Sequence, residues 1–269
     1  MLLAAIPGGS TVWAADLTPA PRVAAVAVAD WTGPYLGMSF GDRWANAEWT
    51  TTRAGAALLP PVPGATPAIV ASEDHAFRAA SYFGYNLQAG SHFVIGIEAD
   101  VAGALSARRI QGIPGVVSSL VRDGAGIREG WDASIRGRAG ALLTPSILLY
   151  GTGGVSWQEF GLSATCLVVD VSWCTATRGE AISVVRQGWT AGAGVEARIG
   201  PHWLARAEYR YADYGRLDHT FFAGVPANRV EMHATLHTQT ALVGLAYQFG
   251  EQSAATAVAM PVKAKASDV

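Results

Sequence analysis

Lysine is almost absent from this chain of 269 residues. Its only two lysines are Lys263 and Lys265, close to the C-terminus, and every other basic residue is arginine. A water-facing surface normally carries scattered lysines, whereas the planar guanidinium of arginine suits enclosed pairs with carboxylates. The missing lysines therefore indicate that most charges of this chain lie in enclosed places.

Long apolar runs are missing as well. Half of the residues are hydrophobic and only 15% are charged, yet no run approaches the ~20 apolar residues that a membrane helix needs. The net charge of -2 gives no sign of a nucleic-acid partner. The 31 glycines and 9 tryptophans fit close-packed strands with aromatic ends. The length allows one large barrel or two small domains.

Cysteine is scarce, and Cys166 and Cys174 are the only two. An exported chain would oxidise them, so we predict a disulfide that staples one loop, with a stabilisation of ~2.6 kcal/mol from chain entropy. Two cysteines without a nearby histidine cannot complete a tetrahedral zinc site. We therefore expect neither metal binding nor redox chemistry from this pair.

What the chain does contain is strict alternation, which is clearest from Gly188 to Tyr211. Odd positions there are small, apolar or aromatic on both sides of the turn at Gly200-Pro201. The charges all fall on even positions: Glu196, Arg198, Arg206, Glu208 and Arg210. This period of two predicts a β-hairpin with one charged face and one apolar face.

The same alternation recurs along the chain and predicts eight strands, while leaving the two faces of 147–157 ambiguous. Short turns are expected near residues 89–91, 144–145 and 200–201, and long loops near 50–74, 107–128, 161–185 and 215–235. Short turns alternating with long loops are typical of outer-membrane barrels. The predicted strands cover residues 33–49, 75–88, 92–106, 129–143, 146–160, 186–199, 202–214 and 236–249.

The alternation of odd and even positions alone does not show which face of the strands meets water. A soluble, lipocalin-like barrel would place the apolar face inside. The missing lysines, the small residues on the charged face and the aromatic residues at strand ends favour lipid outside instead. We therefore predict an all-β, eight-stranded antiparallel up-and-down transmembrane β-barrel. Its interfacial aromatic girdle would be Trp31, Tyr35, Phe93, Trp189, Trp203, Tyr209, Tyr211, Tyr247 and Phe249.

The charged face then lines the lumen with both signs of charge. An eight-stranded barrel is only wide enough for side chains to fill it, which favours a salt-bridged plug over a selective channel. The predicted lumen network is Glu98, Asp100, Arg136, Arg138, Glu196, Arg198, Arg206, Glu208 and Arg210.

The chain divides into four segments. Residues 1–14 are expected to be a secretion signal that lacks its basic front part, because small residues precede Ala15-Asp16. Residues 15–30 are expected to be a periplasmic linker, 31–250 the barrel, and 251–269 a flexible tail.

A family resemblance rests on motifs spread over nearly the whole barrel. The chain resembles the small outer-membrane β-barrel proteins of alphaproteobacteria, a group also called the porin family or outer membrane protein β-barrel domain. The motifs are Ala14–Leu17, Trp31–Gly37, Phe83–Asn86, Gly96–Asp100, Ser134–Gly140, Leu149–Gly154, Gly188–Thr190, Gly194–Glu196, Ala207–Tyr211 and Val243–Phe249.

The resemblance implies a location in the cell outer membrane of a Gram-negative bacterium. Implied partners are outer-membrane lipid, lipopolysaccharide and the barrel-assembly machinery, which reads the last strand. The chain departs from the family pattern at two points: residues 250–269 follow Phe249, where relatives end, and Pro34 replaces an aromatic residue. The oligomeric state stays open.

No catalytic pattern stands out. A P-loop, a nucleophile elbow and a dinucleotide fingerprint are all missing. The histidines do not cluster, and His233 and His237 would lie ~13 Å apart on a strand at 3.3 Å per residue. We expect no cofactor, no metal and no enzymatic activity, with a structural or surface-exposed role. The alternatives are a small diffusion porin, a haem-type uptake protein or, less favoured, a lipid-modifying barrel enzyme. The six histidines are His75, His92, His202, His219, His233 and His237.

Overall fold

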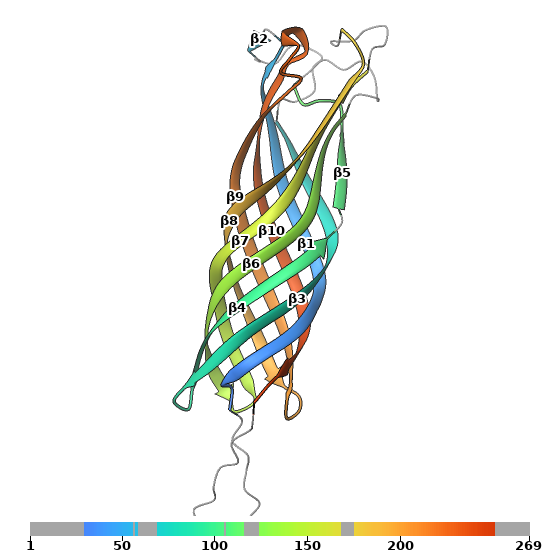
Figure 1. Ribbon diagram of the computed structural model, residues 1–269. Helices are drawn as coiled ribbons and strands as arrows, with labels where there is room; N and C mark the ends of the chain where they lie inside the picture. Colours follow the sequence, from blue (N-terminus) through green and yellow to red (C-terminus); the bar gives the residue numbers. More distant parts are fainter. Residues whose placement is uncertain are drawn as a thin grey trace, which may run out of the picture. The chain divides into compact units, whose positions relative to one another are not determined.

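The computed structural model describes residues 30–55, 57–58, 69–104, 106–115, 124–167 and 175–250, which belong to one compact unit. Eight of the strands described there form a closed antiparallel ring, because β10 pairs with β1 (Figure 1). This confirms the predicted up-and-down barrel. The strands are β1 (Gly33–Ala54), β3 (Ile69–Ala89), β4 (Phe93–Ala104), β6 (Gly124–Thr144), β7 (Ile147–Cys166), β8 (Arg178–Arg198), β9 (Trp203–Phe221) and β10 (Val230–Gln248).

Three short elements complete the described structure. β2 (Ala57–Leu58) pairs with β1, and β5 (Ser106–Gln111) extends the wall beyond β4 by pairing with β6. A 3-10 turn, η1 (Pro226–Asn228), lies between β9 and β10. Within the described ranges, no helix is long and apolar enough to cross a membrane.

The strands are right in number, all of the ring strands except β4 are longer than predicted, and the errors lie at one end of the barrel. At the end with the short turns, where β1 begins and β10 ends, the predicted limits hold to within a residue or two. At the long-loop end, β8 begins at Arg178 rather than at 186, and β9 ends at Phe221 rather than at 214. Seven of the eight ring strands therefore have 19 to 22 residues, whereas the predicted spans have 13 to 17.

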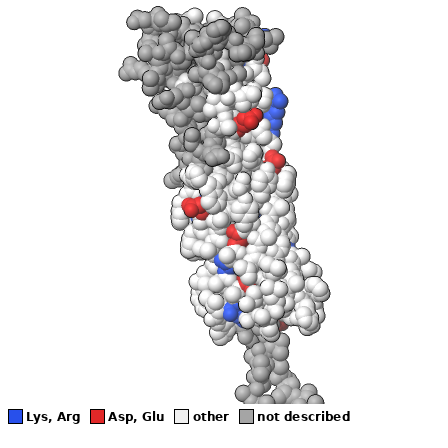
Figure 2. Space-filling model, turned by 180° about the vertical axis from the view of Figure 1, so that it is seen from behind, with Lys and Arg blue, Asp and Glu red and all other residues white. Residues whose placement is uncertain are grey.

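The alternation places charges inside and apolar groups outside in the short-turn half. On β1, Leu36, Met38 and Phe40 are exposed on the outer wall, while Ser39 and Arg43 are buried. Figure 2 shows one face of this wall, on which charged residues are few. The ambiguous segment of β7 resolves in the same way, because the exposed Leu149 and Val155 alternate with buried inward residues.

The interior consists of three layers along the barrel axis. Next to the short turns lies a cluster that we call the short-turn cluster: Trp31, Tyr35, Tyr82, Val94, Leu148, Tyr150, Leu204 and Ala246. A layer of buried charges follows. Beyond it lies the long-loop core, built around Trp49, Ile113, Phe160, Leu162, Tyr214, Phe221, Met232 and Leu236.

The long-loop core reverses the polarity of the wall. Trp49 stacks on Phe221 with ring centroids 5.7 Å apart, and both side chains are fully buried. On β10, inward Met232 and Leu236 alternate with outward Glu231 and His233, whereas nearer the short turns the outward residues are apolar. The long-loop half is therefore packed like a soluble barrel, and this reversal explains why strand ends there were predicted as loop.

Candidate functional site: the buried charge layer

The charge layer is electrically balanced. Six arginines and six carboxylates are buried among the described residues, so their formal charges cancel. Ionised groups are rarely buried unless they are paired, because desolvation of each ion costs several kcal/mol. The members are Arg43, Arg78, Arg136, Arg138, Arg206, Arg210, Glu98, Asp100, Glu129, Asp132, Glu196 and Glu208.

Glu98 of β4 is a centre of the layer nearer the short turns. Its two carboxylate oxygens accept from Arg136 Nη2 at 2.5 Å and from Arg206 Nη1 at 2.6 Å. The hydroxyl of Tyr35 donates to the same carboxylate at 2.8 Å. Charge-assisted bonds of this kind are about twice as strong as neutral ones, so Glu98 ties β1, β6 and β9 together.

Glu208 of β9 is a second centre. It accepts from Arg136 at 2.6 Å, from Arg210 at 2.9 Å and from the hydroxyl of Tyr150 at 2.8 Å. Arg136 thus bridges the two centres across the lumen. Arg136 lies on β6 and Tyr150 on β7, so their bonds cross the barrel, whereas Arg210 is two residues from Glu208 on the same strand.

The network continues toward the long-loop core. Asp100 pairs with Arg78 and Arg210, both at 2.8 Å, and accepts from the hydroxyl of Ser134. Asp132 then pairs with Arg78 and Arg43, both at 2.6 Å. At the far end, Arg43 lies 2.8 Å from Glu129.

Aromatic rings pack against the buried charges, and glycines leave the space that these rings need. The guanidinium of Arg206 lies 3.4 Å from the centroid of the Tyr82 ring, and that of Arg138 lies 4.2 Å from Tyr150. A Cβ atom at Gly84 would lie 2.4 Å from the Tyr35 hydroxyl, and one at Gly37 would lie 2.4 Å from the Tyr82 ring. These glycines therefore make room for the tyrosines that cover the charges.

The structure brings eight of the nine predicted lumen residues together and excludes Arg198. Arg198 is half-buried at the short-turn end, where it donates to the carbonyls of Pro201 and Asp30 and to the side chain of Gln248. Its guanidinium also lies 5.0 Å from the Trp31 ring. The prediction for Arg198 was wrong because β8 ends at this residue, so its side chain lies at the rim of the barrel and not in the charge layer.

The sequence interpretation missed Arg43, Glu129 and Asp132. Arg43 directly follows the outward-facing Asp42, so two neighbouring charges hid the alternation on β1. On β6, the register against β7 shifts between Glu129 and Asp132, and this bulge lets both residues face inward although they are three apart. Arg78 of β3, which is buried, was also not among the predicted members of the network.

Two members of the predicted aromatic girdle are also misplaced. Trp31 and Tyr35 are 0% and 2% exposed and lie in the short-turn cluster. Trp31 Nε1 donates to the carbonyl of Pro145 at 3.1 Å, and Tyr35 falls on the inward parity of β1. The other seven lie on the outer wall, exposed or half-exposed: Phe93, Trp189, Trp203, Tyr209, Tyr211, Tyr247 and Phe249.

The charge layer leaves little free space. A cavity of about 10 Å³ lies between Arg43, Gln158 and Thr240, and a volume of this size holds about one water molecule. Gln158 is fully buried, and neither polar atom of its amide has a hydrogen-bond partner among the described residues. We therefore expect one ordered water beside Gln158.

Metal ligands and cysteines add no further site. No group of three His, Cys, Asp or Glu side chains in the described part of the chain is arranged to hold a metal ion. Cys166 takes part in a disulfide, and Cys174 lies outside the described residues.

Barrel closure, the apolar outer wall and the ion-paired lumen together define a transmembrane β-barrel. The family model described as "Outer membrane protein beta-barrel domain" matches residues 16–249, and the chain belongs to that family. Its place is therefore the cell outer membrane.

Curated relatives agree over most of the chain. The 25 kDa outer-membrane immunogenic protein of Brucella abortus is 28% identical over 251 residues, covering 91% of this chain and 94% of the relative. The 31 kDa outer-membrane immunogenic protein of Brucella melitensis is 28% identical, with 86% and 88% covered. The 22 kDa outer membrane protein of Rhizobium leguminosarum is 33% identical over 150 residues, covering 56% of this chain and 58% of the relative.

Solved structures show the same fold at low identity. The outer membrane protein OprG of Pseudomonas aeruginosa has a TM-score of 0.50 and 13% identity, covering 82% of this chain and 98% of OprG. The outer membrane protease OmpT of Escherichia coli has a TM-score of 0.50 and 10% identity, covering 81% and 97%. At such identities the likeness concerns the barrel alone.

Proposed function

We propose that this protein is a non-conducting outer-membrane barrel with a structural and surface-exposed role. The observation that carries the proposal is the layered interior, in which a neutral charge layer lies between the short-turn cluster and the long-loop core. A porin needs a continuous wet path along its axis. Such a path would have to disrupt all three layers.

The charge layer also argues against a gated pore. Opening it would separate pairs such as Arg136 with Glu98 or Arg78 with Asp132, whose side chains have at most 9% exposed surface. Stranding a buried charge typically costs about 3–5 kcal/mol. The interior therefore behaves as a plug that stabilises the barrel.

The outer wall supports contact with lipid and lipopolysaccharide. Phe93 and Trp203 near the short turns, and Trp189 farther up the wall, are exposed aromatic side chains at two heights, as two membrane interfaces require. The last strand ends beside Phe249, which would serve as the signal for the assembly machinery. The Brucella relatives are named outer-membrane immunogenic proteins, which fits a surface role for this chain.

Conductance across a planar bilayer tests the proposal. Purified protein whose gel mobility shifts on boiling, as a folded barrel's does, should produce no discrete current steps above those of the bare bilayer. A general porin reconstituted in parallel shows that steps are detectable. Stable open-channel steps from the folded wild-type protein would overturn the plugged lumen and favour the porin alternative.

Absence of catalysis is part of the same proposal. The buried carboxylates are all engaged with arginines, and a chemical role would need one of them free near substrate. Incubation of the folded protein with lipopolysaccharide should release no fatty acid above a boiled sample. Release that depends on the folded state would replace this proposal by the lipid-modifying alternative.

A further inference from the structure

The wall of the long-loop half is not continuous. β8 and β9 pair from Trp189↔Asp213 down to Arg198↔Leu204, yet both strands continue beyond that point toward the long loops. Over residues 178–188, β8 pairs with β7 on one side and has no ladder partner on its β9 side among the described residues. Figure 1 shows the upper ends of β8 (gold) and β9 (orange) lying apart. We call this opening the β8–β9 seam.

Burial marks the seam independently of strand pairing. The inward side chains of β7 and β10 in this half, such as Phe160 and Met232, are buried. On β8, every inward side chain from Glu180 to Arg186 is only half-buried, including Ile182 and Val184, which pack on the long-loop core. The seam therefore leaves part of an apolar core open to water.

The backbone along the seam offers a row of free groups. Arg198 N–H donates to β7, at Ser146, while Ile199 N–H donates to Trp203 at the start of β9. Because successive N–H groups of a strand alternate in direction, odd-numbered residues of β8 point toward the seam. Among the described residues, the donors and acceptors without a ladder partner are those of Gly179, Ala181, Ser183, Val185 and Gln187.

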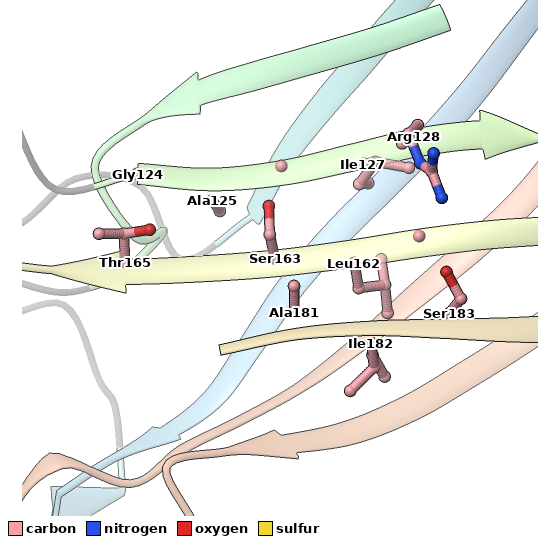
Figure 3. Close-up of a pocket in the computed structure, with 12 residues that line it drawn as sticks. Gly124, Ala125, Ile127, Arg128, Leu162, Ser163, Thr165, Ala181, Ile182 and Ser183 are labelled. Atoms are coloured by element: carbon pink, nitrogen blue, oxygen red, sulfur yellow. The ribbon is translucent and has the colours of Figure 1, made fainter. Parts of the chain in front are cut away.

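The two edges of the seam differ in protection. The β9 edge has a register shift against β10 near Gly215, whose φ is +68°, and an exposed ion pair between Arg216 and Asp218 at 2.8 Å. Bulges and charges are the devices that keep an edge strand from pairing. The β8 edge has neither from Ala181 to Val185, a run of five uncharged residues rich in β-branched side chains. Figure 3 shows this segment beside β7.

We propose that the β8 edge from Gly179 to Gln187 binds an extended peptide segment of another protein by β-strand addition. A strand is the one occupant that pairs a row of alternating backbone donors and acceptors. Charge along the edge specifies the peptide further. Glu180 and Arg186, of opposite sign, flank the inward-facing Ile182 and Val184.

Cross-strand neighbours share one face of a sheet, so the edge sets the order of side chains in an antiparallel partner. An acidic residue lies opposite Arg186, apolar residues lie opposite Val184 and Ile182, and a basic residue lies opposite Glu180. Small polar residues occupy the three positions between them and face water. The recognised segment is therefore seven residues long, alternating and electrically neutral.

In the unbound protein, the side chains of Glu180 and Arg186 bridge the seam to the other edge. The Glu180 carboxylate accepts from the Phe222 N–H at 2.6 Å and lies 3.2 Å from His219 Nε2. Arg186 Nη2 donates to the carbonyl of Arg216 at 2.8 Å. A peptide with complementary charges at its two ends replaces these contacts by ion pairs with Glu180 and Arg186. Peptides that lack such charges cannot replace the contacts and are excluded. The inference does not depend on whether the lumen conducts, because the seam lies in the wall.

The test uses the folded full-length protein in lipid nanodiscs and the fluorescent, end-blocked probe peptide Asp-Thr-Val-Ser-Val-Thr-Lys. Fluorescence anisotropy should show saturable binding. Hydrogen exchange should show new protection of the amides of Ala181, Ser183 and Val185, which lie opposite the probe, with none added at 191–197, where β8 is already paired. Methylating the peptide nitrogens at its second, fourth and sixth residues, which face β8, should weaken binding at least tenfold. Methylation at the third and fifth should leave binding within about threefold.

A pair of protein variants tests the same hydrogen bonds from the side of β8. Val185→Pro removes one seam-facing N–H without touching the β7 ladder and should weaken binding at least tenfold, whereas Val185→Thr should stay within twofold. The gel shift on boiling verifies that both variants are folded, and the methylated peptides test wild-type protein if Val185→Pro does not fold. The proposal is overturned if millimolar probe adds no protection at Ala181, Ser183 and Val185. Equal losses from the two methylated peptides would overturn it as well.

Discussion

Arg136 and Glu98 are directly opposite neighbours on adjacent strands inside the barrel, with Arg136 Nη2 2.5 Å from Glu98 Oε1 and no exposed surface on either side chain. The pair joins β6 to β4, and Arg136 also reaches Glu208 on β9 at 2.6 Å. Two fully desolvated ions that share further partners are tightly coupled, because neither has water to replace a lost contact. The stability of the whole layer therefore depends on each member.

Glu98→Gln should destabilise the barrel by about 3–5 kcal/mol, because Arg206 and Arg136 would retain their buried charge without this carboxylate. Urea unfolding in detergent, followed by the loss of the compact unboiled gel band, measures the change. Arg128→Ala is the matched control, since the Arg128–Glu159 pair lies 3.8 Å apart with Arg128 55% exposed. That variant should change stability by less than ~1 kcal/mol. Equal effects of the two substitutions would show that burial does not govern the layer.

Gly84→Ala tests the room made for the tyrosines. The added Cβ would lie 2.4 Å from the Tyr35 hydroxyl and 2.7 Å from the Ile97 carbonyl, and overpacking of this kind typically costs about 1–3 kcal/mol. Gly137→Ala adds the same atom to β6, where its nearest neighbour is 3.8 Å away. Thermal unfolding should therefore separate a destabilised Gly84→Ala from a near-neutral Gly137→Ala. A stable Gly84→Ala would mean that Tyr35 can leave Glu98 at little cost.

The sequence specifies the short-turn half well, because a single rule operates there. One face meets lipid and the other a polar lumen, so parity assigns residues such as Glu98 and Arg136 correctly. The expectation that aromatic residues at strand ends face lipid fails for Trp31 and Tyr35, which lie in the lumen, and Arg198 reaches the rim because its strand ends there. The alternation rule itself fails at the β6 bulge, which places Glu129 and Asp132 on one face.

The long-loop half could not be assigned in this way, because there the interior is apolar and the exterior polar. Alternation persists on β10, but Met232 and Leu236 face inward while Glu231 and His233 face water. A rule that expects apolar groups on the outside of every strand therefore predicts loops for such segments. Nothing local in the sequence marks the point of reversal, which depends on how far the wall extends beyond the membrane.

Trp49→Ala should loosen the long-loop half selectively. The indole is fully buried, stacks on Phe221 and donates from Nε1 to Thr51 at 3.0 Å, and Trp-to-Ala changes in cores cost about 3–5 kcal/mol. Hydrogen exchange should accelerate at the amides of 230–236 but not at 241–247 on the same strand. Trp131→Ala, on the outer wall and 43% exposed, is the control and should leave both segments unchanged. Uniform acceleration along β10 would show that the two halves unfold together.

The reversal of wall polarity predicts where water begins on the outside of the barrel. Phe40 and Glu48 share the outer face of β1, and both are exposed, one apolar and one charged. Eight residues at 3.3 Å separate them by ~26 Å along the strand. For a strand tilted by ~40° this is ~20 Å along the membrane normal, which is most of the ~25 Å height of the apolar band of such barrels. On intact cells, a membrane-impermeant maleimide should therefore label Glu48→Cys and leave Phe40→Cys unlabelled. Ala47→Cys, buried in the long-loop core, controls for access through the wall and should stay unlabelled until the protein is unfolded. Labelling of Phe40→Cys at the rate of Glu48→Cys would place the membrane boundary lower on the wall and contradict the assignment of β1 to lipid at that height.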